Sequence, residues 1–299
     1  MGENMITKNN VDLLEIIKCP ICNCDDIRYF KDKLKCINCN TLFDISNNIP
    51  VMIDKNYSTF IEENLDKICW EDYDVKNKTV RVAKHFDGKK TFFERLSPTY
   101  RVQIGPTYND FIDKYNISEN ILELGGGLSS LQVNGSINMD INTYKDVDIV
   151  GDARKIPFKD NSFEAVISNS VLEHIYEFEA VIKELGRVVK KGGYIFMCVP
   201  QVCGRHHEID YHRWTLPGLE KMFIKYQVID KGVILGPGMF LSHIVTSLFR
   251  DITPIPFINK SICLVIEWLS FPFRFLDLLN RGNSEDYAHT IFIVVKKNS

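Results

Sequence analysis

The chain has 299 residues and a formal net charge of −3, so no overall positive charge favours nucleic acid as a partner. With 45% hydrophobic and 25% charged residues, the composition excludes a disordered chain and suits one large core with a small satellite domain. The first residues, MGENMITKNN, are polar and lack the apolar run of a signal peptide. We therefore expect a cytoplasmic protein.

Two C-x-x-C pairs, Cys19 with Cys22 and Cys36 with Cys39, are the first motif along the chain. Each tight turn aims two thiolates at one ion, and two such turns complete a closed tetrahedral zinc site. Cys24 is a third thiol beside the first pair that could exchange with Cys22, and a disulfide or free thiols are the alternative to a metal. The apolar residues around the pairs form a core too small to fold without an ion, so we expect structural zinc.

The order of LLEIIKCPIC, CINC and IPVMI over residues 11–53 resembles the small zinc-ribbon domain related to the activator subunit of certain tRNA and protein methyltransferases. The resemblance implies a zinc ribbon at residues 1–54, placed ahead of a methyltransferase domain. Residues 55–117 are polar and dotted with aromatic side chains, and we expect them to form a helical linker or cap.

A glycine-rich turn follows in NILELGGGLSS. An apolar strand at 121–124, carrying Glu123, runs into Gly125, Gly126 and Gly127, which let the backbone turn tightly and approach a ligand. The dinucleotide fingerprint G-x-G-x-x-G is excluded because Ser130 stands where its last glycine would be. The turn alone indicates only a nucleotide-type cofactor.

Three more strand patterns end in polar residues: INMDI at Asp140, VDIVGDA at Asp152, and FEAVISN at Asn169. Strands alternate with helical patterns, as in a doubly wound parallel sheet whose ligands lie at the carboxyl ends of the strands. Asp140 can take both hydroxyls of a ribose, while Asp152 can accept from an exocyclic amine such as that of adenine. Either aspartate alone would more often be a cap or turn residue, but their common register predicts a binding edge.

Together, ELGGG, Asp140, GDARKIPFKDNSFEAVISNSVLEHI and ELGRVVKKGGYIFMCVP are similar to successive motifs of class I S-adenosylmethionine-dependent methyltransferases of the type 11 kind, over residues 118–235. The resemblance implies an α/β, Rossmann-like seven-stranded sheet with helices on both faces, in a domain at residues 118–299. Ser129 stands where the family often has glycine, and it is small enough that we expect the turn to survive.

The same resemblance implies a set of cofactor-binding residues. Those around the methionine part are Glu123, Gly125, Gly126 and Gly127; Asp140 holds the ribose; Asp152 and Ala153 edge the adenine; Ser168 and Asn169 line the methyl-transfer side. In the following LEH stretch, His174 either contacts cofactor or substrate or makes a structural hydrogen bond.

The stretch GRHHEIDYHRW at 204–214 follows the fifth strand, so it lies at the carboxyl edge where an acceptor meets the donor methyl group. Histidine titrates near neutral pH, and His206 and His207 are the candidate catalytic bases. Asp210, Tyr211 and Arg213 are candidate substrate contacts. A purely structural loop is the alternative, and a metal site is disfavoured because the H-x-x-x-H spacing is absent.

Residues 236–286 form an apolar insertion before the last strand, which we expect to be helical. Lys260, Glu267 and Arg274 interrupt it, so no run is long and charge-free enough to span a bilayer. On a continuous helix these three would share one face, although Pro272 could kink it. The alternatives are packing on the sheet or on another subunit in a homo-oligomer, peripheral membrane contact through residues 239–279, or a lid over the acceptor.

We therefore expect a methyltransferase that uses S-adenosylmethionine, carries structural Zn²⁺ and methylates a small-molecule or glycan-type acceptor at oxygen. The first alternative is a zinc-ribbon rRNA or tRNA methyltransferase, against which residues 11–53 contain about as many acidic as basic side chains. The second is a non-catalytic scaffold, against which ELGGG, Asp140 and Asp152 are all intact. Membrane association is the alternative to a purely cytoplasmic location.

Overall fold

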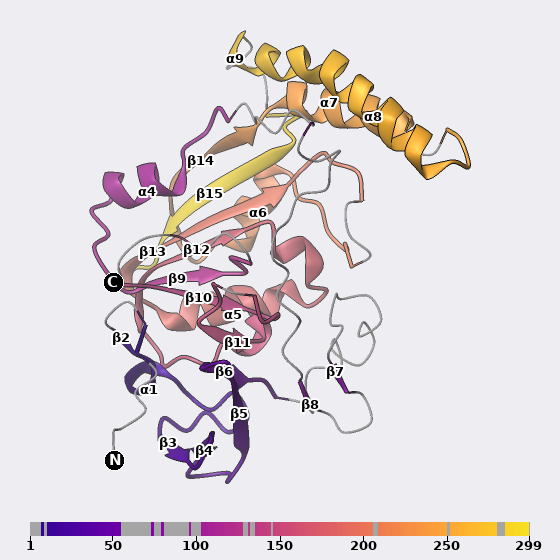
Figure 1. Ribbon diagram of the computed structural model, residues 1–299. Helices are drawn as coiled ribbons and strands as arrows, with labels where there is room; N and C mark the ends of the chain where they lie inside the picture. Colours follow the sequence, from indigo (N-terminus) through magenta and orange to yellow (C-terminus); the bar gives the residue numbers. More distant parts are fainter. Residues whose placement is uncertain are drawn as a thin grey trace.

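The computed structural model describes residues 7–8, 11–54, 73–74, 79–80, 96, 103–127, 131, 135–144, 146–205, 209–249, 252–279 and 285–298. An eleven-stranded sheet forms its centre, in the order β14-β15-β13-β12-β9-β10-β11-β6-β5-β4-β3 (Figure 1). Two short hairpins stand apart from it: β1 (Thr7–Lys8) with β2 (Val11–Asp12), and β7 (Tyr73–Asp74) with β8 (Thr79–Val80).

Seven of these strands form the doubly wound part of the sheet. They are β9 (Ile121–Leu124), β10 (Ser136–Asp140), β11 (Ile149–Gly151), β12 (Phe163–Asn169), β13 (Val189–Pro200), β14 (Gln227–Leu235) and β15 (Thr290–Lys296). The strands from β9 to β13 run parallel to one another, while β15 is antiparallel to both β13 and β14. Every residue of β9 and β10 is buried, as expected for parallel strands covered on both faces. The predicted α/β Rossmann-like fold is confirmed.

The strand count differs from the seven expected, because the N-terminal unit extends the same sheet. Its strands are β3 (Ile27–Phe30), β4 (Lys33–Cys36), β5 (Leu42–Ser46) and β6 (Ile49–Met52), preceded by α1 (Leu13–Ile16). β6 pairs in parallel with β11, with Val51 opposite Val150 and Met52 opposite Gly151. A sheet edge presents unpaired N–H and C=O groups, and the N-terminal unit covers this one.

Helices cover both faces, as the alternation of side chains along the strands shows. On β13, Ile195 and Met197 face a core shared with α5 (Phe178–Val188) and α6 (Leu216–Met222). Phe196, between them, faces the opposite core, which contains Phe111 of α4 (Tyr108–Lys114). Successive strand residues point to opposite faces, so α4 covers one side of the sheet and α5 and α6 cover the other.

Most of the predicted linker or cap at 55–117 lies outside the described residues. Within it, α4 begins at a capping box in which the Thr107 hydroxyl accepts from the Asp110 N–H and the Asp110 carboxylate accepts from the Thr107 N–H. Its residues Phe111 and Ile112 are buried on the sheet, so α4 packs as part of the large core.

The apolar insertion forms a helical hairpin at one end of the sheet (Figure 1). It comprises α7 (Pro237–Leu248), α8 (Pro256–Ser270), the 3₁₀ helix η3 (Phe271–Phe275) and α9 (Leu276–Leu279). The α-helix stops before Pro272, so the helix is not continuous; Arg274 in η3 is buried, whereas Lys260 in α8 is exposed. Among the described helices, none is both long and apolar enough to cross a membrane.

Candidate functional site

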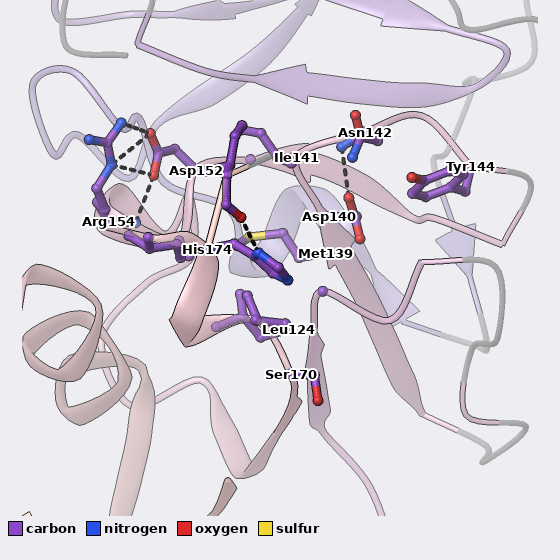
Figure 2. Close-up of a pocket in the computed structure, with 16 residues that line it drawn as sticks. Leu124, Met139, Asp140, Ile141, Asn142, Tyr144, Asp152, Arg154, Ser170 and His174 are labelled. Carbon is purple, nitrogen blue, oxygen red and sulfur yellow. Dashed lines mark hydrogen bonds and ion pairs between the residues drawn. The ribbon is translucent and has the colours of Figure 1, made fainter. Parts of the chain in front are cut away.

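A cavity of about 280 Å³ opens at the carboxyl ends of β9 to β12 (Figure 2). Its lining comes from the loops after these strands and from one residue after β13. The lining residues are Leu124, Gly125, Met139, Asp140, Ile141, Asn142, Tyr144, Gly151, Asp152, Ala153, Arg154, Ser170, Val171, His174, Ile175 and Ile209. Four of the nine predicted cofactor residues are among them: Gly125, Asp140, Asp152 and Ala153.

The turn after β9 requires glycine. Gly125 has φ +73°, and a Cβ atom there would lie 2.3 Å from a methyl carbon of Val171. A Cβ atom on Gly126 would lie 2.5 Å from the carboxyl carbon of Glu123. That carboxylate is buried behind the turn and accepts a 2.7 Å hydrogen bond from the N–H of Leu131. Glu123 therefore braces the turn and does not line the cavity.

Asp140, at the end of β10, is a buried carboxylate that is hydrogen-bonded to this turn. Its Oδ2 accepts from the N–H of Gly127 at 3.2 Å. Its Oδ1 accepts from the N–H of Asn142 at 2.8 Å (Figure 2). Burial raises its pKa to about 6. The carboxylate lines the cavity and has further lone pairs for a ligand that donates hydrogen bonds.

Asp152, after β11, is held by Arg154, a residue that the sequence did not single out. The carboxylate accepts from the Arg154 backbone N–H at 2.9 Å and from its Nη2 at 2.7 Å, and Nη1 of the same guanidinium donates to Glu177 at 2.6 Å. Both members of the first pair are buried. Asp152 is thus fixed at the cavity wall next to Ala153, and its contact with an adenine amine stays a prediction.

After β12, the residues that line the cavity directly follow the two that were predicted for the methyl-transfer side. Ser168 is buried and Asn169 is exposed, and neither lines the cavity, whereas Ser170 and Val171 do. Ser170 adopts a left-handed φ of +55°, and its N–H donates to the carbonyl of Cys198 at 3.0 Å. This backbone conformation turns the chain across the cavity.

His174 is the last residue of η2 (Leu172–His174), and it lines the cavity. Its Nδ1 contacts the carbonyl oxygen of Ile209 (Figure 2). A carbonyl can only accept, so Nδ1 carries a proton and donates, which leaves Nε2 as the nitrogen able to take a proton. Nε2 lies 3.7 Å from Oε1 of Glu173.

The loop GRHHEIDYHRW is only partly described, and His206 and His207 lie outside the described residues. Asp210 and Arg213 bind each other, with Nη2 donating to Oδ2 at 2.7 Å, and this hydrogen bond raises the pKa of Arg213. Tyr211 is 45% exposed, and its backbone N–H donates to the Glu173 carbonyl at 2.8 Å. None of the three lines the cavity, so their contact with an acceptor stays a prediction.

Glu173, adjoining this loop, is fully buried, and burial raises its pKa from 4.5 to about 7. The folded chain therefore keeps a proton that the unfolded chain releases above pH 4.5, so the free energy of unfolding falls as pH rises towards 7. We expect Glu173→Gln to remove up to about 3 kcal/mol of this pH dependence, at about 1.4 kcal/mol per pKa unit.

Urea titrations of the wild type and Glu173→Gln between pH 4 and pH 8, a range that covers the whole interval from 4.5 to about 7, measure this difference. Glu179→Gln, a change at an exposed glutamate on α5, is the matched control and should keep the wild-type pH dependence. An equal pH dependence in the wild type and Glu173→Gln would show that Glu173 does not have a raised pKa.

A second site lies in the N-terminal unit, where the Sγ atoms of four cysteines lie within 4.8 Å of one another: Cys19, Cys22, Cys36 and Cys39. The Cys19–Cys39 and Cys22–Cys36 separations are 3.7 and 3.5 Å. A disulfide would bring two sulfurs to about 2.05 Å. Zinc–sulfur bonds of about 2.3 Å in a tetrahedron place the sulfurs about 3.8 Å apart, so the four thiols fit a metal.

Cys24 lies outside this group of four. Its sulfur accepts a hydrogen bond from the N–H of Asp26 at 3.4 Å. The structure thus brings the two C-x-x-C pairs together, and their binding of a metal stays a prediction, while Cys24 stabilises the neighbouring turn.

The N-terminal unit also binds the segment that follows Asp152. The Lys18 N–H donates to the carbonyl of Pro157 at 3.0 Å, and the Lys159 N–H donates to that of Ile16 at 2.8 Å. Lys155 forms a 2.8 Å ion pair with Asp54. The N-terminal unit is therefore continuous with the wall of the cavity.

The parallel sheet, the glycine turn after its first strand and the carboxylates after the next two define the class I methyltransferase architecture. Residues 125–197 match the family model described as a methyltransferase domain, of the type 11 family. This match confirms the methyltransferase domain that the sequence motifs predicted.

Two curated relatives that the chain matches in part are named demethylmenaquinone methyltransferase. A demethylmenaquinone methyltransferase of Bacillus cereus (strain B4264) is 31% identical over 135 residues, which cover 42% of this chain and 52% of the relative. That of Corynebacterium glutamicum (strain R) is 49% identical over 45 residues, 15% of this chain and 20% of the relative. The chain thus spans about half the length, or less, of these relatives.

Solved structures that the chain matches include the complex between the Haloferax volcanii Trm112 methyltransferase activator and a methyltransferase. The match is 14% identical, covers 61% of this chain and 83% of that chain, and has a TM-score of 0.40. Haemonchus contortus phosphoethanolamine N-methyltransferase 2 in complex with S-adenosyl-L-methionine is 19% identical, with 61% and 49% covered and a TM-score of 0.39.

Proposed function

We propose that this protein transfers a methyl group from S-adenosylmethionine to the oxygen of a small-molecule or glycan-type acceptor. The observation that carries the proposal is the cavity at the carboxyl edge, bounded by the Gly125 turn and by Asp140, inside a methyltransferase domain. The names of the curated relatives support an acceptor of small-molecule type.

The cavity wall offers a partner for each part of this donor. Asp140 would accept from the two ribose hydroxyls, which are hydrogen-bond donors, while its own bonds to the Gly127 and Asn142 N–H groups keep it oriented. Ala153 and Asp152 would edge the adenine, and the turn at Gly125 to Gly127 would pass the methionine part. Ser168 and Asn169 remain proposals for the methyl-transfer side, next to Ser170 at the cavity.

The donor supplies a methyl group on a sulfonium sulfur, which the acceptor oxygen displaces in line, leaving S-adenosylhomocysteine. The oxygen forms its new bond to carbon as the carbon–sulfur bond breaks, and the hydroxyl proton passes to a base. The chain's part is to align the partners and take that proton. His206 and His207 are the proposed bases, and His174 joins them because its Nε2 can take a proton at the cavity.

Mass spectrometry of a cell extract, incubated with the protein and isotopically labelled methyl donor and then separated into small molecules and RNA, tests the reaction. We expect a labelled methyl ether, and we expect alanine substitution of the base among His206, His207 and His174 to lower turnover about 10²- to 10⁴-fold with S-adenosylhomocysteine binding retained. A label found only in RNA would overturn the acceptor class, and the same turnover in all three variants would overturn a histidine base.

We further propose that the four-cysteine group holds one structural Zn²⁺. Four thiolates close the tetrahedron and leave no position for a substrate, so the ion would stabilise the N-terminal unit and take no part in methyl transfer.

A further inference from the structure

The helical hairpin of α7, α8, η3 and α9 carries most of the exposed large apolar side chains of the described chain. Fifteen of the twenty-four lie between Leu241 and Leu279. They include Leu248 at 71%, Phe257 at 68% and Leu269 at 69% exposure. Scattered single apolar residues are normal on a surface, but such a concentration marks an interaction site.

Polar and charged side chains of the same hairpin point inward. Ser242, Ser270, Arg274 and Asp277 are all at most 5% exposed. Arg274 Nε donates to the Ser242 hydroxyl at 3.2 Å, which lies 3.2 Å from that of Ser270. The Asp277 carboxylate accepts from the Gly238 N–H at 2.6 Å, at the start of α7. The hairpin is therefore polar inside and apolar outside, the reverse of an ordinary helical pair in water.

We propose that this hairpin, residues 237–249 and 252–279, docks on the surface of a lipid bilayer. Hydrocarbon offers no hydrogen-bond partners, so an element that enters it must satisfy its polar groups internally, as Ser242, Arg274 and Asp277 do. A protein partner makes no such demand, because its own surface supplies donors and acceptors.

The spread of the apolar side chains also fits a bilayer better than a second copy of the chain. They lie on α7, at the α7–α8 connection (Ile252 and Ile255), along α8, and on α9 beyond it. α8 alone has 15 residues and is about 22 Å long at 1.5 Å per residue. A bilayer surface contacts such a length without needing a matching groove.

The same length excludes a membrane-spanning role and favours an interfacial position. A spanning helix needs about 20 apolar residues, and α8 has 15. Within the described hairpin, Lys260 is the one exposed charged side chain, since Glu267 is half-buried. Docking should therefore depend on inserted apolar side chains more than on anionic lipid.

The place of the hairpin in the fold orients the protein on such a surface. β14 and β13 are both antiparallel to β15, so they are parallel to each other, and β14 ends at the same sheet edge as the strands around the cavity. α7 begins directly after β14, at Pro237. Docking would bring this edge of the sheet towards the bilayer.

Flotation of the full chain with phosphatidylcholine vesicles tests the proposal without reference to methyl transfer. We expect the wild type to float with the vesicles, with little change when phosphatidylserine is added or the salt concentration is raised. Phe257→Asp and Leu269→Asp should each lower the bound fraction at least about tenfold, because a charge would enter the hydrocarbon.

Ile224→Asp is the matched control, since Ile224 is 69% exposed but follows α6, outside the hairpin, and it should float like the wild type. Circular dichroism shows whether each variant is folded. Absence of flotation by the folded wild type would overturn the proposal, and so would equal loss in the control. A wild-type dimer that Leu269→Asp splits, with no vesicle binding, would assign the hairpin to a second copy instead.

Discussion

Replacing Asp140 by asparagine is expected to weaken the binding of S-adenosylhomocysteine about 10- to 100-fold, since a hydrogen bond to a charged group contributes about 1.5–3 kcal/mol. Asparagine keeps the shape of the side chain but loses the charge that two ribose hydroxyls would meet. It can also accept through only one oxygen, whereas Asp140 uses both towards Gly127 and Asn142. Calorimetric titration of both proteins measures the change.

The wild type should also show a pH dependence that the variant lacks. Burial raises the pKa of Asp140 to about 6, so the carboxylate is ionised above that pH and protonated below it. Affinity should therefore fall up to about tenfold for each pH unit below 6, a limit set by one bound proton. Asp230→Asn, in an exposed ion pair with Lys114 on the far strand β14, is the control. Equal affinities of Asp140→Asn and Asp230→Asn would contradict the ribose role.

Replacing Cys36 by serine is expected to release the metal and unfold the N-terminal unit. Structural zinc stabilises small domains by on the order of 10 kcal/mol, and the Cys36 side chain is fully buried within the donor set. β6 would then leave β11, the strand that leads to Asp152, so affinity for S-adenosylhomocysteine should also fall about tenfold. Elemental analysis, circular dichroism and calorimetry measure the three effects.

Cys24→Ser is the matched control for Cys36→Ser, because Cys24 lies in the same unit but outside the four sulfurs. It should retain the metal and the cofactor affinity of the wild type. Loss of the metal in Cys24→Ser with retention in Cys36→Ser would show that the donor set is wrong. Metal loss with unchanged cofactor affinity would show that the two sites are independent.

The parts of the fold that sequence reasoning anticipated depend on local patterns. Glycines after an apolar strand can only serve a tight turn, and acidic residues at strand ends fall on one edge of any parallel sheet. Gly125 and Asp140 were therefore placed at the cavity from the sequence alone. In the same way, the local C-x-x-C spacing predicts which four cysteines lie close together.

Strand pairings and ion pairs between residues far apart in the sequence could not be predicted from such local patterns. The pairing of β6 with β11 depends on which edge remains open after the domain folds, and the sequence of neither strand specifies it. The Arg154 guanidinium could have joined many carboxylates, and the structure pairs it with Asp152 and Glu177. Helical periodicity places Arg274 on the face of Lys260 only where the helix is continuous, and the helix changes type at Phe271, next to Pro272.

Which residues after β12 line the cavity depends on the backbone at the end of that strand. Ser168 and Asn169 end the strand, but the left-handed Ser170 turns the chain so that it and Val171 reach the cavity. His174 reaches it through η2, a 3₁₀ turn that helical periodicity cannot distinguish from the start of an α-helix.

Calorimetric titration of S-adenosylhomocysteine into the purified, metal-loaded protein tests the central claim most directly. The account predicts saturation at one ligand per chain, and no binding by folded Gly125→Val, whose side chain would meet Val171 across the turn. Absence of binding to the folded wild type, or equal binding by Gly125→Val, would contradict the assignment of this cavity to the methyl donor.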